Sequence, residues 1–142
     1  MPALPQHIHP MVVHFPIALF FTALFFEVFS WVFKNKGLHT TALYLYVAAA
    51  LLTPLVVLTG LREAQRLNLH HHILTEHRAY ALWTMWSTLV SLPFLGFFAV
   101  KYPKIFRVFF ILCLLNAAVL VTLTGHVGGE MVFNYGVGTD LF

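Results

Sequence analysis

Hydrophobic residues occur along this chain in four long runs, which short groups of polar and charged residues interrupt. The runs cover residues 11–33, 40–61, 79–100 and 105–124. Each is at least as long as the roughly 20 residues that an α-helix needs to cross the hydrocarbon of a bilayer. The pattern therefore predicts an all-α integral membrane protein whose four runs are transmembrane helices.

The connections between the runs predict how the four helices follow one another. Short polar segments at residues 34–39 and 101–104 join the first run to the second and the third to the fourth. Helices joined by such short loops lie antiparallel as neighbours. Residues 62–78 form a longer connection, which either continues the second helix or lies along the membrane interface. We expect a four-helix bundle of two antiparallel up-down hairpins, with residues 1–142 forming a single transmembrane domain.

Composition supports a membrane protein and excludes several classes of soluble protein. Of the 142 residues, 60% are hydrophobic and only 9% are charged, whereas average soluble domains have about 25% charged residues. The helices need nearly the whole length, so we expect the lipid membrane as surroundings and no soluble catalytic domain. The net charge of +3 comes without a cluster of basic and aromatic residues, so we expect no nucleic-acid partner. The single cysteine excludes paired-cysteine zinc and haem-attachment motifs.

Lysine and arginine are unevenly distributed between the two ends of the predicted bundle. The two short loops carry lysine without any acid, whereas arginines at the other end are mixed with glutamate. Cytoplasmic loops of membrane proteins are enriched in Lys and Arg. We therefore expect a multi-pass protein of the cell (inner) membrane with both termini extracytoplasmic.

Several histidines gather at the end of the bundle that carries the termini. His9 and His14 stand at the start of the first helix, His77 opens the third, and His126 closes the fourth. Histidine is rare in membrane segments without a partner, and imidazoles that project inward from facing helices are how four-helix bundles hold haem iron or a metal ion. We interpret His14, His77 and His126 as candidate cofactor ligands, and add His9 as a candidate ligand of a bare metal ion.

Glycine and arginine near these histidines favour a macrocycle over a bare ion. Gly60, Gly125, Gly128 and Gly129 lack side chains and would let a flat ring approach the backbone. Arg62 and Arg78 lie where the carboxylate propionates of a haem would emerge. The prediction is a haem b with two histidine ligands near the outer face of the membrane.

The motifs around these residues resemble those of the small bacterial and archaeal membrane proteins known as domain of unknown function 2231. The matches are His-Pro-x-x-x-His-Phe-Pro-Ile-Ala at residues 9–18, Thr59-Gly60, His77, Gly128-Gly129-Glu130 and Gly136-Val137-Gly138. Family members often carry histidine just before the last motif, where this chain has Tyr135. Some relatives look like cytochrome-b-type modules and occur beside Rieske and c-type cytochrome domains, so the resemblance implies redox work.

Three functions remain open at this point. The first is an electron-transfer subunit, a homo-oligomer or part of a larger complex, that exchanges electrons between quinone and an extracytoplasmic redox protein. The second is a non-haem protein in which His9, His14, His77 and His126, with Glu76 or Glu130, bind iron, copper or zinc. The third is a structural or assembly subunit whose histidines only form hydrogen bonds at the helix ends.

Overall fold

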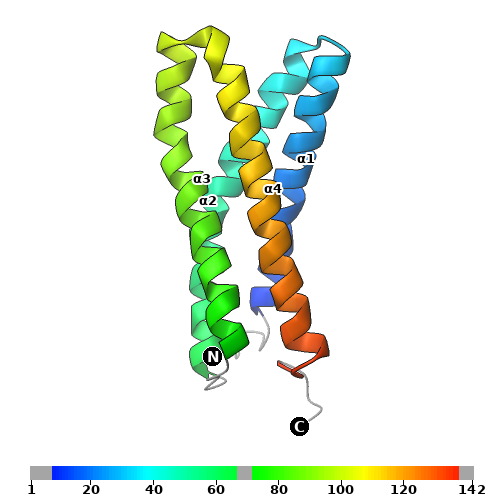
Figure 1. Ribbon diagram of the computed structural model, residues 1–142, viewed down its shortest axis with the longest axis vertical. Helices are drawn as coiled ribbons and strands as arrows, with labels where there is room; N and C mark the ends of the chain where they lie inside the picture. The colour runs from blue at the N-terminus through cyan, green and yellow to red at the C-terminus, as the bar shows by residue number, and fades with distance from the viewer. Residues whose placement is uncertain (1–7, 67–71, 138–142) are drawn as a thin grey trace, which may run out of the picture.

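The computed structural model describes residues 8–66 and 72–137, and within these ranges it contains helices and no strand. Figure 1 shows the four helices that these residues form. They are α1 (Ile8–Val32), α2 (Lys36–Arg66), α3 (His72–Lys101) and α4 (Pro103–Phe133). The expected all-α fold of four helices is confirmed.

The helices extend beyond the hydrophobic runs, most of all between the second and the third. Helix α2 continues to Arg66 and α3 begins at His72, so helix occupies most of the connection at residues 62–78. The segment that follows Leu61 is rich in Arg, Glu, Ala and Gln, which are strong helix formers, and contains no Pro or Gly. The second helix continues as far as Arg66, and residues 67–71 of the connection lie outside the described residues.

All four helices are long and apolar enough to cross a membrane. Large hydrophobic side chains cover the outside of the bundle, among them Phe25, Leu51, Trp83 and Leu112. A water-soluble monomer rarely exposes apolar surface on this scale. Lipid chains are the surroundings that match this surface.

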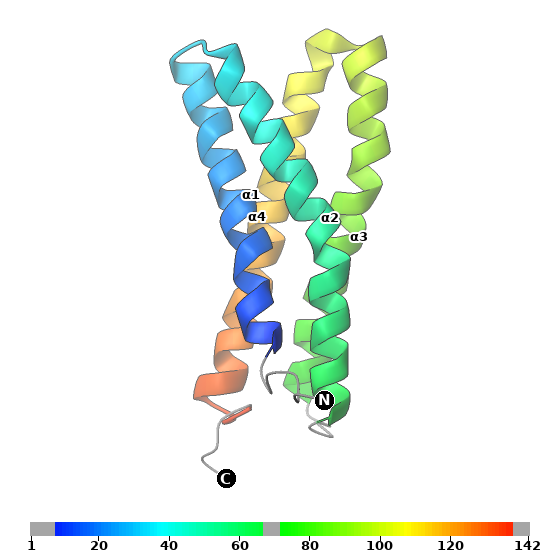
Figure 2. The same ribbon diagram turned by 180° about the vertical axis from the view of Figure 1, so that it is seen from behind.

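The helices pair first within each half of the chain. Helix α1 packs mainly against α2, and α3 mainly against α4, while the contacts of α1 with α4 and of α2 with α3 are fewer. Figures 1 and 2 show that the two hairpins diverge at their loops, whereas toward the termini α2 lies beside α3 and α1 beside α4. The expected pair of antiparallel hairpins is therefore what the chain forms.

Small residues bring the helices close together in the middle of the bundle. Ala23, Ala49 and Ala117 lie in the main core with the rings of Phe20 and Tyr46. Small side chains allow helix backbones to approach in a membrane, where lipid provides no hydrophobic driving force between helices.

An ion-pair cluster joins three helices near the loop end. Glu27 on α1 is only 1% exposed, and its carboxylate accepts a hydrogen bond from Arg107 Nε on α4 at 2.8 Å. His39 on α2 approaches the other carboxylate oxygen with its Nδ1 at 2.6 Å. Arg107 also donates to the Ser30 hydroxyl and covers the Trp31 ring. Because a buried carboxylate is costly without such partners, this cluster holds the second hairpin against the first.

We predict that Glu27→Ala lowers the free energy of unfolding by about 2 kcal/mol, because Arg107 loses a charge-assisted hydrogen bond inside the bundle. The measurement is unfolding of the purified protein in mixed detergent micelles. Glu76→Ala, which removes an exposed carboxylate, is the control and should change this free energy by no more than about 0.5 kcal/mol. Equal effects of the two substitutions would contradict the role of the cluster.

Candidate functional site

A cavity of about 730 Å³ opens at the end of the bundle opposite the ion-pair cluster. Its volume lies within the range of roughly 300–1,000 Å³ that is usual for ligand sites. Residues of all four helices line it, and most of the wall is apolar, with Val13, Val56, Val57, Leu61 and Leu74 as examples. The polar part of the wall includes three histidines, His9, His72 and His77, and an arginine.

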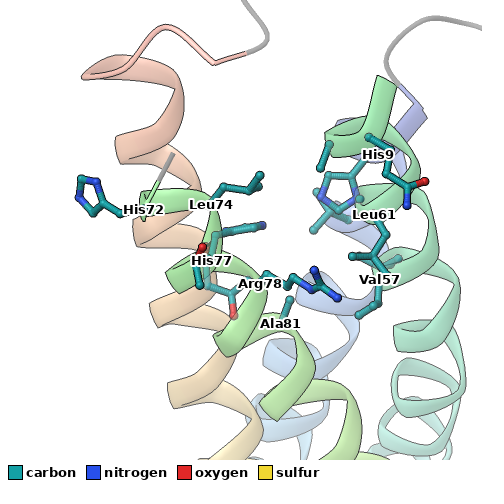
Figure 3. Close-up of a pocket in the computed structure, with 15 residues that line it drawn as sticks. His9, Val57, Leu61, His72, Leu74, His77, Arg78 and Ala81 are labelled. Atoms are coloured by element: carbon teal, nitrogen blue, oxygen red, sulfur yellow. Dashed lines mark hydrogen bonds between the residues drawn. The ribbon is translucent and has the colours of Figure 1, made fainter. Parts of the chain in front are cut away.

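His9 and His77 face this cavity from opposite sides, as Figure 3 shows. His9 lies in the first turn of α1, and His77 lies in the second turn of α3. Their ring centroids are 6.4 Å apart, and the two ring planes are nearly perpendicular at 88°. The structure thus brings together two imidazoles that are 68 positions apart in the sequence (77 − 9).

Hydrogen bonds decide which nitrogen each imidazole presents. His77 Nδ1 lies 3.0 Å from the carbonyl oxygen of Thr124, which can only accept, so Nδ1 carries the proton. His9 Nδ1 lies 3.1 Å from Thr59 Oγ1. The Thr59 hydroxyl donates its one proton to the Val56 carbonyl at 2.8 Å, so His9 Nδ1 must be the donor here too. Both rings therefore keep Nε2 as the nitrogen with a lone pair.

Two glycines allow the histidine rings to pack directly against neighbouring helices. A Cβ atom at Gly60 on α2 would stand 2.9 Å from His9 Cε1, and one at Gly128 on α4 would stand 3.1 Å from His77 Cε1. Gly60 therefore belongs to the site, as the sequence suggests. Gly128, which the sequence also suggests, belongs to the site as well.

The other two glycines that were expected at the cofactor lie elsewhere. A Cβ atom at Gly125 or Gly129 would meet nothing within 4 Å, and neither residue lines the cavity. Successive residues of a helix are about 100° apart. Gly129 therefore points about 100° away from the face on which Gly128 meets His77. The structure does not bring these two glycines to the histidine pair.

His14 and His126 are likewise outside the cavity. His14 is exposed, and its Nδ1 donates to the carbonyl of Pro10 in its own helix. The His126 side chain is 69% exposed and lies 3.6 Å from Glu130 on the next turn. His126 is two residues from Gly128, which is about 200° around the helix. His77 thus shares its site with His9 instead of with these two histidines.

The two arginines expected at the cofactor, Arg62 and Arg78, lie in different places. Arg78 lines the cavity, and Figure 3 shows its side chain extending into it below the histidines. Arg62 is exposed and does not line it. Arg78 is therefore the cation available to a carboxylate in the cavity.

A site made only of protein ligands does not form here. Among residues 8–66 and 72–137, no three His, Cys, Asp or Glu side chains lie together in a way that could hold a metal ion. The four histidines considered for a bare ion, His9, His14, His77 and His126, thus supply only one close pair. Two imidazoles suit a metal ion whose remaining ligands come from a larger group, as in haem.

Comparison with known proteins identifies the family. The family model described as "Predicted membrane protein (DUF2231)" matches residues 5–141. This chain belongs to the DUF2231 family. No curated protein and no solved structure matches it. Two motif residues of this DUF2231 chain, His9 and His77, form the histidine pair. Three others contact the pair, namely Thr59, Gly60 and Gly128. Gly138 lies outside the described residues.

We predict that Gly60→Ala displaces the His9 ring from Thr59 in this DUF2231 protein, because the added methyl group would stand 2.9 Å from the ring. The free energy of unfolding should fall by about 1 kcal/mol. Unfolding in detergent and the ¹⁵N shifts of His9 provide the two measurements. Gly125→Ala is the matched control, since its methyl group meets open space, and it should leave His9 unchanged. Indistinguishable His9 shifts in the two variants would contradict the packing of His9 on Gly60.

Proposed function

We propose that this protein is a membrane-embedded, b-type cytochrome-like electron-transfer protein in which His9 and His77 would hold one haem b. The observation that carries the proposal is the pair of imidazoles that keep Nε2 available at a ring-centroid distance of 6.4 Å. The proposed ligand pair retains His77 from the sequence interpretation and takes His9 in place of His14 or His126.

The spacing of the rings suits a metal ion between them. Bonds from imidazole nitrogen to a metal ion are about 2.0–2.1 Å long, so two imidazoles on opposite sides of one ion have ring centres about 6 Å apart. His9 and His77 have this spacing within a few tenths of an ångström. Their Nδ1 hydrogen bonds to Thr59 and Thr124 are of the kind that orients histidine ligands of metals.

The walls of the cavity suit the rest of the group. Valine and leucine side chains provide an apolar surface for a macrocycle, and Arg78 provides a cation for a propionate. When bound, haem b supplies a one-electron redox couple. The chain would contribute two histidine ligands, the hydrogen bonds behind them, an apolar wall that excludes water, and the positive charge of Arg78.

The place of the cavity determines the proposed partners. A single redox group near one face of the membrane cannot carry electrons across the bilayer alone. We therefore propose exchange between quinone in the membrane and an extracytoplasmic redox protein on the same side, with the chain acting as a homo-oligomer or within a larger complex. We assign the cavity and both termini to the extracytoplasmic side of the cell (inner) membrane, because Lys34, Lys36, Lys101 and Lys104 lie at the opposite end.

We predict that the protein purified after adequate haem supply shows a Soret band. His9→Ala or His77→Ala should abolish or shift this band, because each removes a proposed ligand. His14→Ala and His126→Ala are the matched controls and should leave the spectrum unchanged, since both side chains lie outside the cavity. A wild-type protein without a Soret band would refute the proposal, and a bound transition metal without porphyrin absorbance would favour the non-haem alternative.

We predict the orientation of the chain to be readable by cysteine labelling in a Cys113→Ala background. Asn35→Cys in the first loop should react with an impermeant maleimide only after the cells are permeabilised. Phe133→Cys, at the exposed end of α4, should react in intact cells. The reverse pattern would place the cavity on the cytoplasmic side.

A further inference from the structure

We infer that Thr59 is a positioning residue that selects the Nδ1–H tautomer of His9 and thereby makes His9 the adjustable member of the histidine pair. The consequence for ligand binding rests on the proposed function. The hydrogen bonds of Thr59 form without haem, so the role of Thr59 and the proposed haem binding can be tested separately.

Thr59 acts on His9 through a short relay that ends on the backbone. The Thr59 hydroxyl donates to the Val56 carbonyl at 2.8 Å, one turn earlier in α2. With its proton committed there, Oγ1 faces His9 Nδ1 at 3.1 Å as an acceptor. An acceptor at this place stabilises the ring only when Nδ1 carries the proton, which leaves Nε2 with its lone pair.

Thr59 and its neighbour Gly60 together position the His9 ring. The hydroxyl sets the protonated nitrogen, and the missing side chain of Gly60 lets the ring lie where a Cβ atom would be 2.9 to 3.3 Å from Cε1, Nδ1 and Nε2 of His9. The ring therefore lies over the backbone of α2 and cannot turn over without leaving the hydroxyl. Adjacent positions of α2 thus control the orientation of a side chain that α1 supplies.

His77 is held differently, and the difference provides an internal control. Its Nδ1 donates to the backbone carbonyl of Thr124, an acceptor that no side-chain substitution removes. At His9 a side-chain oxygen, Thr59 Oγ1, lies 3.1 Å from Nδ1, and the Val56 backbone carbonyl also interacts with the ring. Substitution at Thr59 can therefore change the tautomer of His9, whereas no side-chain substitution removes the acceptor of His77.

The first test uses the haem-free protein with ¹⁵N-labelled histidine, in which nitrogen shifts report the tautomer of each ring. Wild type should show Nδ1–H at both His9 and His77. Thr59→Val keeps the shape of the side chain and removes the acceptor, so the ratio of Nδ1–H to Nε2–H at His9 should fall about fivefold, with His77 unchanged. Thr59→Ser restores the hydroxyl and should restore the wild-type ratio. An unchanged His9 tautomer in Thr59→Val, or equal changes at both histidines, would overturn the inference.

The second test uses the haem-loaded protein, with carbon monoxide as a probe of the ligand pair. An Nε2–H imidazole has no lone pair to offer at that nitrogen. Carbon monoxide should therefore displace His9 from the haem iron more readily in Thr59→Val. Carbon monoxide should bind reduced Thr59→Val up to about fivefold more tightly than wild type or Thr59→Ser, because the same hydrogen bond is lost. Equal affinities in all three would count against the inference while leaving haem binding intact. A wild type that shows the expected tautomers but no Soret band would refute the proposed function and leave the role of Thr59 standing.

Discussion

A polar group inside a bilayer has to find its hydrogen-bond partner within the protein, because lipid chains offer none. The structure meets this constraint throughout the described residues, where no buried side-chain nitrogen or oxygen lacks a partner. Threonine and serine hydroxyls in the bundle donate to carbonyls of the preceding turn, as Thr53 and Thr88 do. Tyr46 meets Ser91 across the α2 and α3 contact. The buried Glu27 carboxylate and the His9–His77 pair occur where several helices meet.

The two ends of the bundle use histidine for opposite purposes. At the loop end, His39 Nδ1 meets a buried carboxylate, and the rings of Phe106 and Phe110 lie against the imidazole. That arrangement fills the space between helices and connects them. At the other end, His9 and His77 meet neutral oxygens and stand at a cavity. The same residue type therefore joins helices near one end of the bundle and faces a cavity at the other.

The sequence predicts the helices well because hydrophobicity alone requires them, and it predicts their pairing because two loops are short. It predicts the histidine pair only in part. His9 and His14 lie on one helix but point about 140° apart, and which of them faces His77 depends on how α1 is rotated against its neighbours. Hydrophobic length carries no information about that rotation. The Glu27 cluster could not be predicted from the sequence for a related reason, since its partner Arg107 is 80 residues away. The neighbours Thr59 and Gly60 are a usable signal, because a hydroxyl beside a glycine on a membrane helix can both bind and admit a ring.

Each hairpin carries one half of the candidate site in complete form. In the first, α1 supplies His9 while α2 supplies its acceptor Thr59 and the gap at Gly60. In the second, α3 supplies His77 while α4 supplies the carbonyl of Thr124 and the gap at Gly128. The site therefore lies between two hairpins, each of which supplies one histidine with its acceptor and its glycine, and a ligand bound to both histidines would connect the two hairpins. Such a molecule would stabilise the native arrangement by mass action, so the supply of ligand would govern how firmly the two halves of the protein stay together.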